Sequence, residues 1–125
     1  MPNPYFSFKQ FTIRHDRCAM KVGTDGVLLG AWTCLDGSRR ILDIGTGTGL
    51  IALMLAQRSP GAFITAIDID ADAVGQAGEN IQESPWKDRV EARLQDVCTY
   101  QPEAPFDTIV SNPPYFIDSL KFFPY

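Results

Sequence analysis

The feature that most constrains the fold is a short apolar run that ends in a glycine-rich loop and leads directly into a helical pattern. Residues 40–44 (RILDI) predict a buried strand, and residues 50–58 predict a helix that Ser59-Pro60-Gly61 ends. The segment between them, residues 43–49 (DIGTGTG), carries three glycines. Glycines allow positive φ and close approach of a ligand to the backbone, and the start of a helix offers free N–H groups. This order predicts the first unit of an α/β domain with a ligand at the loop.

The same alternation continues along the chain. Further strands are predicted over residues 63–67, 90–94 and 106–110, and Asp70 is expected to cap a helix over residues 71–83. The face of this helix that packs on the sheet is expected to carry Val74, Ala77, Gly78 and Ile81. Strands that alternate with helices imply right-handed crossovers and a parallel sheet. The predicted fold class is therefore α/β and Rossmann-like, with helices on both faces of the sheet.

The two ends of the chain differ from this core. Residues 5–13 predict a short strand or extended arm, and residues 24–35 predict a helix that Thr24 and Asp25 can cap. We therefore divide the 125 residues into an N-terminal arm and helix (1–40) and a cofactor-binding core (41–125). The chain stops soon after the fourth predicted strand. We expect an incomplete sheet of about four core strands whose exposed edge belongs to a fragment or supports self-association.

Composition excludes several classes of protein. The three cysteines are widely spaced and there is one histidine, so we predict neither a disulfide framework nor a metal site. The sequence has no apolar run long enough for a membrane helix and no signal-peptide pattern, and we expect a cytoplasmic protein. The net charge of -4 argues against a nucleic-acid binder. Basic residues nevertheless gather before residue 41, where they form either a phosphate-contacting surface or an ordinary solvated set: Lys9, Arg14, Arg17, Lys21, Arg39 and Arg40.

The glycine loop indicates the chemistry of its ligand. The dinucleotide pattern GxGxxG would place a third small residue where Leu50 stands, and Asp43 would repel a pyrophosphate but not a cationic sulfonium amino acid. These two residues favour S-adenosyl-L-methionine over NAD. Asp68 ends the second core strand at about the offset where an acid binds a ribose diol. Asp96 follows the third strand, where a carboxylate can meet the adenine amine.

A proline-rich tetrapeptide, residues 112–115 (NPPY), follows the fourth strand. By itself it could be only a turn. The prolines stiffen the backbone and present carbonyl oxygens, Asn112 adds a side-chain acceptor, and Tyr115 adds an aromatic face. Two acceptors on an exocyclic amine can free its lone pair and direct it at a sulfonium methyl, so that positioning replaces a strong base. Tyr115 would then stack on a base turned out of its RNA.

These motifs together resemble a known family. DIGTGTG, the acid of AIDID (residues 66–70), Asp96 and NPPY are similar to class I S-adenosylmethionine-dependent methyltransferases that act on amino groups. Residues 8–32 resemble more specifically the bacterial methyltransferases that modify N6 of the adenine beside the anticodon of a valine tRNA. The resemblance runs from about Phe6 to Tyr115. Because members of the family continue past NPPY to a seven-stranded sheet, it also implies that this chain is incomplete.

The resemblance implies roles for individual residues. Asp43 and the loop glycines would line the methionine part of the cofactor, Asp68 would hold the ribose and Asp96 the adenine. Residues before the first core strand, Lys21, Gly23, Thr24 and Asp25, would close over the cofactor. The full set of predicted cofactor-binding residues is Lys21, Thr24, Asp43, Gly45, Thr46, Gly47, Gly49, Asp68, Ile69, Asp96, Val97 and Asn112. The predicted catalytic residues are Asn112, Pro113, Pro114 and Tyr115.

Two alternatives to tRNA adenine methylation remain at this point. NPPY also occurs in glutamine N5-methyltransferases of release factors and in some guanine N2-methyltransferases, so it does not fix the substrate. The glutamine methyltransferases carry a helical substrate-binding domain before their first core strand. This chain has only about 40 residues before its first core strand, which argues against that alternative. The second alternative is a cofactor-binding fragment without catalytic activity.

Overall fold

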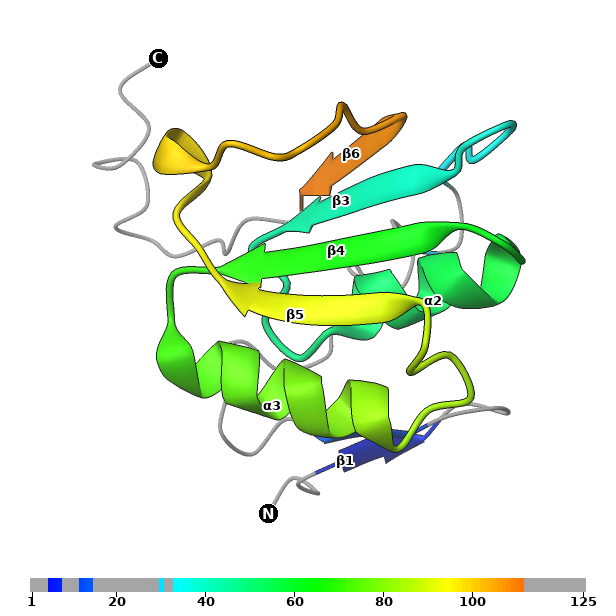
Figure 1. Ribbon diagram of the computed structural model, residues 1–125. Helices are drawn as coiled ribbons and strands as arrows, with labels where there is room; N and C mark the ends of the chain where they lie inside the picture. Colours follow the sequence, from blue (N-terminus) through cyan, green and yellow to red (C-terminus); the bar gives the residue numbers. More distant parts are fainter. Residues whose placement is uncertain (1–4, 8–11, 15–29, 31–32, 112–125) are drawn as a thin grey trace, which may run out of the picture.

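The core of the protein is a four-stranded sheet in which every pairing is parallel (Figure 1). The computed structural model describes residues 5–7, 12–14, 30 and 33–111. The strands are β3 (Arg40–Ile44), β4 (Phe63–Asp68), β5 (Val90–Leu94) and β6 (Thr108–Ser111), in the order β5-β4-β3-β6. The chain thus moves outward from β3 to β5 and then returns to the other side of β3. This confirms the predicted α/β class with four core strands.

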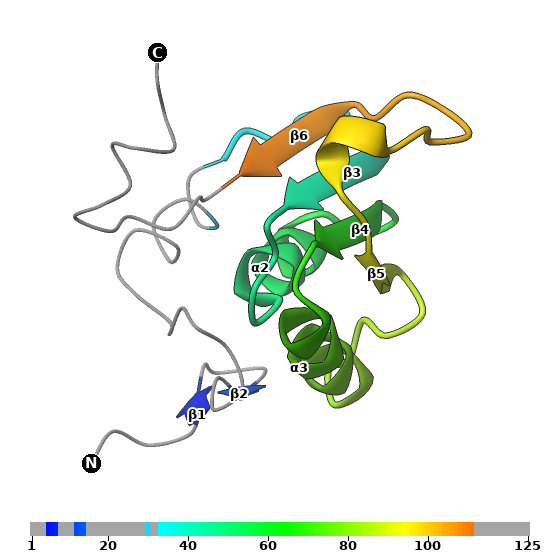
Figure 2. The same ribbon diagram turned by 90° about the vertical axis from the view of Figure 1, so that its left-hand side faces the viewer.

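Two α-helices connect the strands. Helix α2 (Leu50–Arg58) joins β3 to β4, and helix α3 (Ala71–Gln82) joins β4 to β5. Figure 2 shows both helices on the same side of the sheet. The connection from β5 to β6 contains only a short 3-10 helix, η1 (Val97–Thr99). In the described part of the chain, one face of the sheet therefore carries both α-helices.

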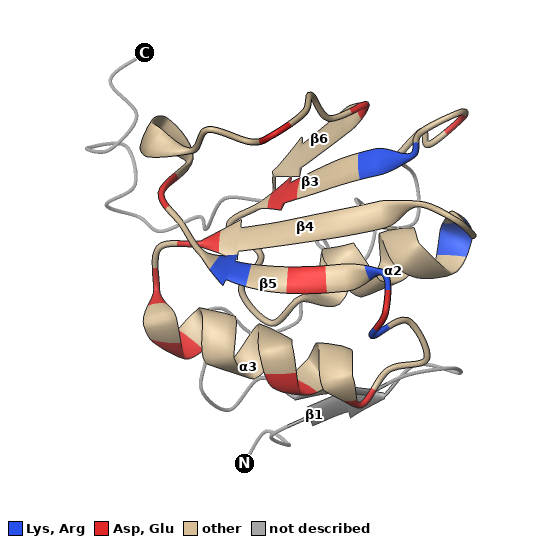
Figure 3. Cartoon of the chain, viewed as in Figure 1, with Lys and Arg blue, Asp and Glu red and all other residues tan. Residues whose placement is uncertain are grey.

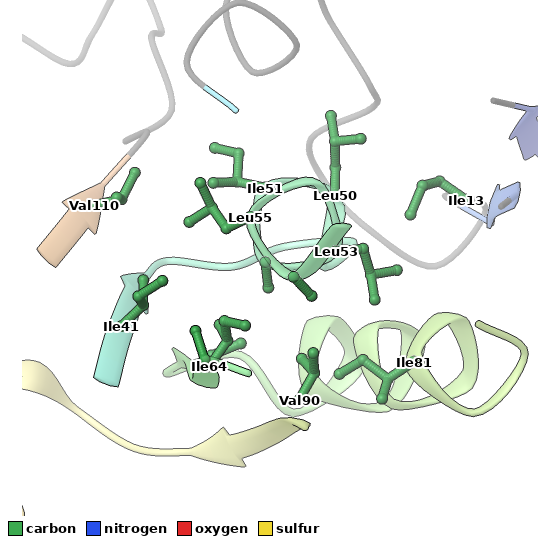
Figure 4. Close-up of a cluster of buried hydrophobic side chains, with 14 residues drawn as sticks. Ile13, Ile41, Leu50, Ile51, Leu53, Leu55, Ile64, Ile81, Val90 and Val110 are labelled. Atoms are coloured by element: carbon green, nitrogen blue, oxygen red, sulfur yellow. The ribbon is translucent and has the colours of Figure 1, made fainter. Parts of the chain in front are cut away.

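The hydrophobic core lies between the sheet and helix α2. Helix α2 buries six of its nine residues, and its side chains meet Ile41, Ile64 and Val90 from the strands (Figure 4). Ile81 of α3 joins the same cluster. So does Ile13 of β2 (Thr12–Arg14), which is fully buried. The N-terminal part of the chain thus contributes to the same core as the sheet.

The observed elements correct four of the predicted boundaries and faces. The predicted arm over residues 5–13 is an antiparallel hairpin of β1 (Tyr5–Ser7) and β2, since Phe6 pairs with Ile13. The helix predicted over residues 24–35 lies mostly outside the described residues, but residues 33–35 are not helical. The fourth strand begins at Thr108, because the carboxylate of Asp107 accepts hydrogen bonds from the N–H groups of residues 39 and 40 ahead of it.

The fourth correction concerns helix α3. Its buried residues are Ala73, Gln76, Ala77, Asn80 and Ile81, whereas Val74 and Gly78 are only partly buried. The helix therefore presents a face that includes two polar residues. Besides the sheet, α3 packs against β2 and against the glycine loop, so its buried face is wider than the one that covers the sheet.

Within the described residues no helix is both long enough and apolar enough to cross a membrane, and no cluster of three or more metal-ligating side chains occurs.

Candidate functional site

The glycine loop after β3 is held in a fixed shape by hydrogen bonds to the end of β4. The N–H groups of Gly45 and Thr46 both donate to the carbonyl of Ile67, at 2.9 and 3.0 Å. Gly45, Gly47 and Gly49 have φ values of 70°, 55° and 85°, a region that residues with a Cβ atom rarely adopt. A Cβ atom built on Gly45 or Gly47 would meet nothing within 4 Å. The loop therefore presents bare backbone toward open space, as a ligand cradle requires.

Asp68 is oriented by two backbone hydrogen bonds. Its Oδ2 accepts from the N–H of Gly47 at 3.0 Å, and its Oδ1 accepts from the N–H of Asp70 at 3.0 Å. A carboxylate oxygen has a second lone pair, so each oxygen can still accept another hydrogen bond. Asp68 thus links the glycine loop to the start of α3 and keeps acceptor capacity for the two hydroxyls of a diol.

Asp43 is buried beneath the loop, with 1% of its surface exposed. Its Oδ2 accepts a hydrogen bond from the Thr46 hydroxyl at 2.9 Å, and its Oδ1 has no hydrogen-bond partner. Burial raises the pKa of the Asp43 carboxyl from 3.8 to about 7; the negative charge of Asp68 adds to the rise and the Thr46 hydrogen bond opposes it. The Asp43 carboxyl is therefore about half protonated near pH 7, at the base of a loop that faces a second carboxylate.

Further carboxylates lie at the same edge of the sheet, where β3, β4 and β5 end (Figure 3). Asp70 caps α3 by accepting from the N–H of Asp72, which confirms the predicted cap. Asp96 caps η1 by accepting from the N–H of Cys98 at 2.9 Å through Oδ1. The edge combines these acids with exposed apolar side chains, since Ile69 is 73% and Val97 43% exposed. Such an edge suits a ligand that has both a positive charge and an apolar ring.

Sequence reasoning missed the contribution of α3 to the loop. The Asn80 side chain is fully buried and donates through Nδ2 to the carbonyl of Thr48 at 2.7 Å. One turn earlier, Ala77 lies so close that a Cβ built on Gly49 would be 3.3 Å from its Cβ. The only available signal in the sequence was a pair of side-chain amides, Gln76 and Asn80, which lie four residues apart with the small residue Ala77 between them. That spacing places both on one helix face.

Part of the predicted site falls outside the described residues. This applies to Lys21, Thr24 and the whole tetrapeptide Asn112, Pro113, Pro114 and Tyr115. The structure brings together the other predicted residues, from Asp43 to Val97, at the carboxyl end of the sheet.

Two of the predicted basic residues are described. Arg39 is exposed, whereas the Arg40 guanidinium lies 4.8 Å from the centre of the Phe106 ring and donates to the carbonyl of Ala104 at 3.3 Å. Arg40 therefore holds the connection before β6 in place, and its role is packing rather than contact with phosphate.

Comparison with known proteins gives consistent matches. A sequence model of the family described as the methyltransferase small domain matches residues 23–121. A protein of Phocaeicola vulgatus named tRNA1(Val) (adenine(37)-N6)-methyltransferase is 70% identical over 121 residues, which are 97% of this chain and 51% of that protein. A protein of the same name from Bacteroides thetaiotaomicron is 68% identical over 122 residues, or 97% of this chain and 52% of that protein. The chain thus spans about half the length of the curated relatives it matches.

A solved structure supports the same fold. The O-methyltransferase from Bacillus cereus in complex with SAH superposes with a TM-score of 0.61 and 28% sequence identity. The match covers 87% of this chain and 53% of the other. The fold of this chain therefore matches about half of a solved methyltransferase.

Proposed function

The chain belongs to the methyltransferase small-domain family, and from this premise we propose that the protein binds S-adenosyl-L-methionine and methylates the exocyclic N6 of an adenine in tRNA. The proposed substrate is the adenine next to the anticodon of a valine tRNA. The names of relatives at 70% and 68% identity support this choice. They favour it over glutamine methylation of release factors, with which the NPPY tetrapeptide alone is also compatible.

One observation carries the proposal: the Asp68 carboxylate is bound to the glycine loop and to the start of α3 by its two oxygens. This arrangement fixes an acceptor pair beside bare loop backbone before any ligand arrives. A preorganised pair of acceptors binds a ribose diol without the cost of ordering a flexible side chain. The same edge carries negative charge, which attracts the cationic sulfonium and disfavours a pyrophosphate.

The described residues fit the proposed cofactor. Gly45, Thr46, Gly47 and Gly49 would lie along its methionine part, with Asp43 beneath them. Asp68 would accept from the ribose hydroxyls and the free Oδ2 of Asp96 from the adenine amine, while Ile69 and Val97 offer apolar contacts to the ring. When bound, S-adenosyl-L-methionine supplies an electrophilic methyl group on a sulfonium centre. Lys21, Thr24 and Asn112 remain proposed cofactor contacts from the sequence alone.

The catalytic part of the proposal rests on the NPPY tetrapeptide. Asn112 and the carbonyl groups of Pro113 and Pro114 would accept hydrogen bonds from the target amine, and Tyr115 would stack on the base. Ser111, the last residue of β6, pairs with Ile44, the residue just before the glycine loop. This register supports the proposal, because it puts the residue before the tetrapeptide in the sequence beside the residue before the loop.

Three further parts of the prediction stay proposals. We propose that residues 1–40 form an arm and helix in front of a cofactor-binding core, and that the protein acts in the cytoplasm. Self-association through an exposed sheet edge also remains a proposal.

Calorimetric titration with S-adenosylhomocysteine tests the cofactor site. The wild-type protein is expected to bind it, and Asp68→Ala is expected to weaken binding at least tenfold, since it removes both acceptors. Asp88→Ala, which changes an exposed carboxylate after α3, serves as the matched control and should bind like the wild type. Equal affinity of the Asp68→Ala variant would exclude the assigned ribose contact.

A transfer assay tests the substrate. Tritiated methyl groups are followed from S-adenosyl-L-methionine into valine tRNA, into the same tRNA with its anticodon-adjacent adenine replaced by guanine, and into a release factor. Label only in the unmodified tRNA is the expected result. Label in the release factor would support the glutamine reaction instead, and binding without transfer to any acceptor would indicate a cofactor-binding module.

A further inference from the structure

A buried hydrogen bond connects helix α3 to the glycine loop. The donor is Nδ2 of Asn80 and the acceptor is the carbonyl of Thr48, at a distance of 2.7 Å. Both residues are inaccessible, with Asn80 0% and Thr48 6% exposed. A fully buried asparagine in a helix is costly unless its polar atoms are satisfied, so its position on this face calls for a structural or functional reason.

The surrounding packing shows how tightly the loop and α3 fit. A Cβ on Gly49 would be 3.3 Å from the Cβ of Ala77, which is closer than ordinary van der Waals contact. The absence of a side chain at Gly49 therefore lets α3 approach the loop, and Asn80 then reaches the carbonyl one residue earlier. Two independent features, a missing Cβ and a buried amide, thus place α3 against the same two residues of the loop.

The hydrogen bond from Asn80 complements those from β4. On the β4 side, the loop is held through Gly45, Thr46 and Gly47. These bonds leave the orientation of the peptide group between Thr48 and Gly49 to other contacts. Two hydrogen bonds orient this peptide group: its N–H, from Gly49, donates to the Thr46 carbonyl at 2.9 Å, and its carbonyl, from Thr48, accepts from the Asn80 amide, which ties it to α3. The hydroxyl of Thr48 in turn accepts from the N–H of Leu50 at 3.3 Å, so the same residue sets the start of α2.

We propose that Asn80 is a positioning residue for the cofactor loop, which it holds in the binding conformation through the Thr48 carbonyl. The inference rests on the proposed cofactor site. It adds Asn80 to the residues that determine cofactor affinity, although Asn80 lies on α3 and not in the loop, and is neither of the two acids, Asp68 and Asp96, that would contact the cofactor. Without the amide donor the Thr48 carbonyl is buried and unpaired, and the loop relaxes to satisfy it at the expense of the cradle.

The test measures S-adenosylhomocysteine affinity of the purified protein by calorimetry. Asn80→Ala is expected to weaken binding about tenfold at every pH, which corresponds to ~1.4 kcal/mol. Gln82→Ala, an exposed amide on the same helix, is the matched control and is expected to bind like the wild type. The binding stoichiometry counts the folded fraction, so that loss of folded protein is not mistaken for loss of affinity.

Asn80→Asp provides a readout that a purely structural role would not move. Above its pKa the new carboxylate cannot donate to the Thr48 carbonyl, whereas its protonated form can. The affinity of this variant relative to wild type is therefore expected to recover as the pH is lowered from 8 to 5.5, while the deficit of Asn80→Ala stays constant. A pH-independent ratio for Asn80→Asp would overturn the inference, as would wild-type affinity in Asn80→Ala.

Failure of the inference is distinguishable from failure of the proposed function. If the wild type does not bind, the cofactor site itself is wrong; if the wild type binds and the Asn80 variants bind equally, only the inference is wrong. If the variants do not fold, an NMR experiment on the wild-type protein still tests the inference. Its Asn80 side-chain amide protons are expected to shift in NMR spectra on addition of S-adenosylhomocysteine, and unchanged resonances would refute the coupling.

Discussion

The buried carboxyl of Asp43 makes the stability of the protein depend on pH in a direction opposite to that of most acids. Its pKa is 3.8 in the unfolded chain and about 7 in the folded protein. Between these values the folded state holds a proton that the unfolded state has lost, so the free energy of unfolding falls as the pH rises from about 4 to about 7. Each pH unit in this window costs ~1.4 kcal/mol, and the whole window therefore costs about 4 kcal/mol. That is a large share of the stability of a single domain.

Asp43→Asn removes this titration while keeping the shape of the side chain. The free energy of unfolding is measured by urea denaturation of both proteins between pH 4 and pH 8, without cofactor. Relative to the wild type, the variant is expected to gain about 4 kcal/mol over this range, because only the wild type has to bury a charge at high pH. The comparison cancels the titration of every other group that the two proteins share.

Asp107→Asn is the matched control, because Asp107 has the opposite environment. Its exposed carboxylate accepts from the N–H groups of Arg39 and Arg40, which lower its pKa. The stabilisation from Asp107 is thus present above pH 4 and is lost only as the pH falls through the lowered pKa. The difference between this variant and the wild type should stay constant from pH 5 to pH 8. A constant difference for Asp43→Asn as well would mean that Asp43 is charged throughout, which would refute the reasoning.

Two further substitutions test the packing around the site. Gly49→Ala places a Cβ at a φ of 85° and 3.3 Å from Ala77, and urea denaturation is expected to show a loss of roughly 2 kcal/mol or more. Gly37→Ala, at a φ of 73° with open space around it, should cost only the backbone strain, so equal losses would argue against a tight contact with α3. Arg89→Ala removes hydrogen bonds of 3.1, 2.7 and 2.8 Å to the carbonyls of Ser59, Ala62 and Ala56 at the end of α2, and should lower the free energy of unfolding by roughly 3 kcal/mol. Arg93→Ala, which removes a surface ion pair with Glu91 (3.9 Å) and a contact with the Tyr100 ring (5.7 Å), is expected to change it by less than about 1 kcal/mol, and a loss comparable to that of Arg89→Ala would argue against these Arg89 hydrogen bonds as the source of stability.

The positions of the strands and helices in the core were predictable because local patterns decide them. The predicted helix over residues 50–58 has the same bounds as α2, and the Asp70 cap forms as expected. Both depend on residues within one turn of each other. The start of β6 was misplaced, since it depends on Asp107 binding backbone groups of residues 39 and 40, which are far away in the sequence.

The residues of the site likewise divide into those that local sequence patterns identify and those that only the packing of the fold reveals. Asp43, Asp68 and the glycines could be found from their spacing after apolar runs, because the ends of parallel strands meet at one edge of the sheet. Asn80 could not, because a polar residue in a helix is ordinarily solvated, and its burial depends on how α3 packs in the folded protein, including its close approach to Gly49. The assignment of Val74 and Gly78 to the packing face failed for the same reason.

The sequence by itself determined the alternation of strands and helices, the glycine loop and the identity of the acids that follow the strands. The spacing of apolar residues and the positions of glycines act over a few residues. They therefore favour the same strands, helices and loop whatever packs around them. Only the tertiary structure decided how these acids differ from one another. Asp43 is buried and takes up a proton near neutral pH, whereas Asp68 is held by two N–H groups at the surface of the loop. The difference arises from burial and hydrogen bonding, which depend on what packs around each carboxyl and not on its neighbours in the chain.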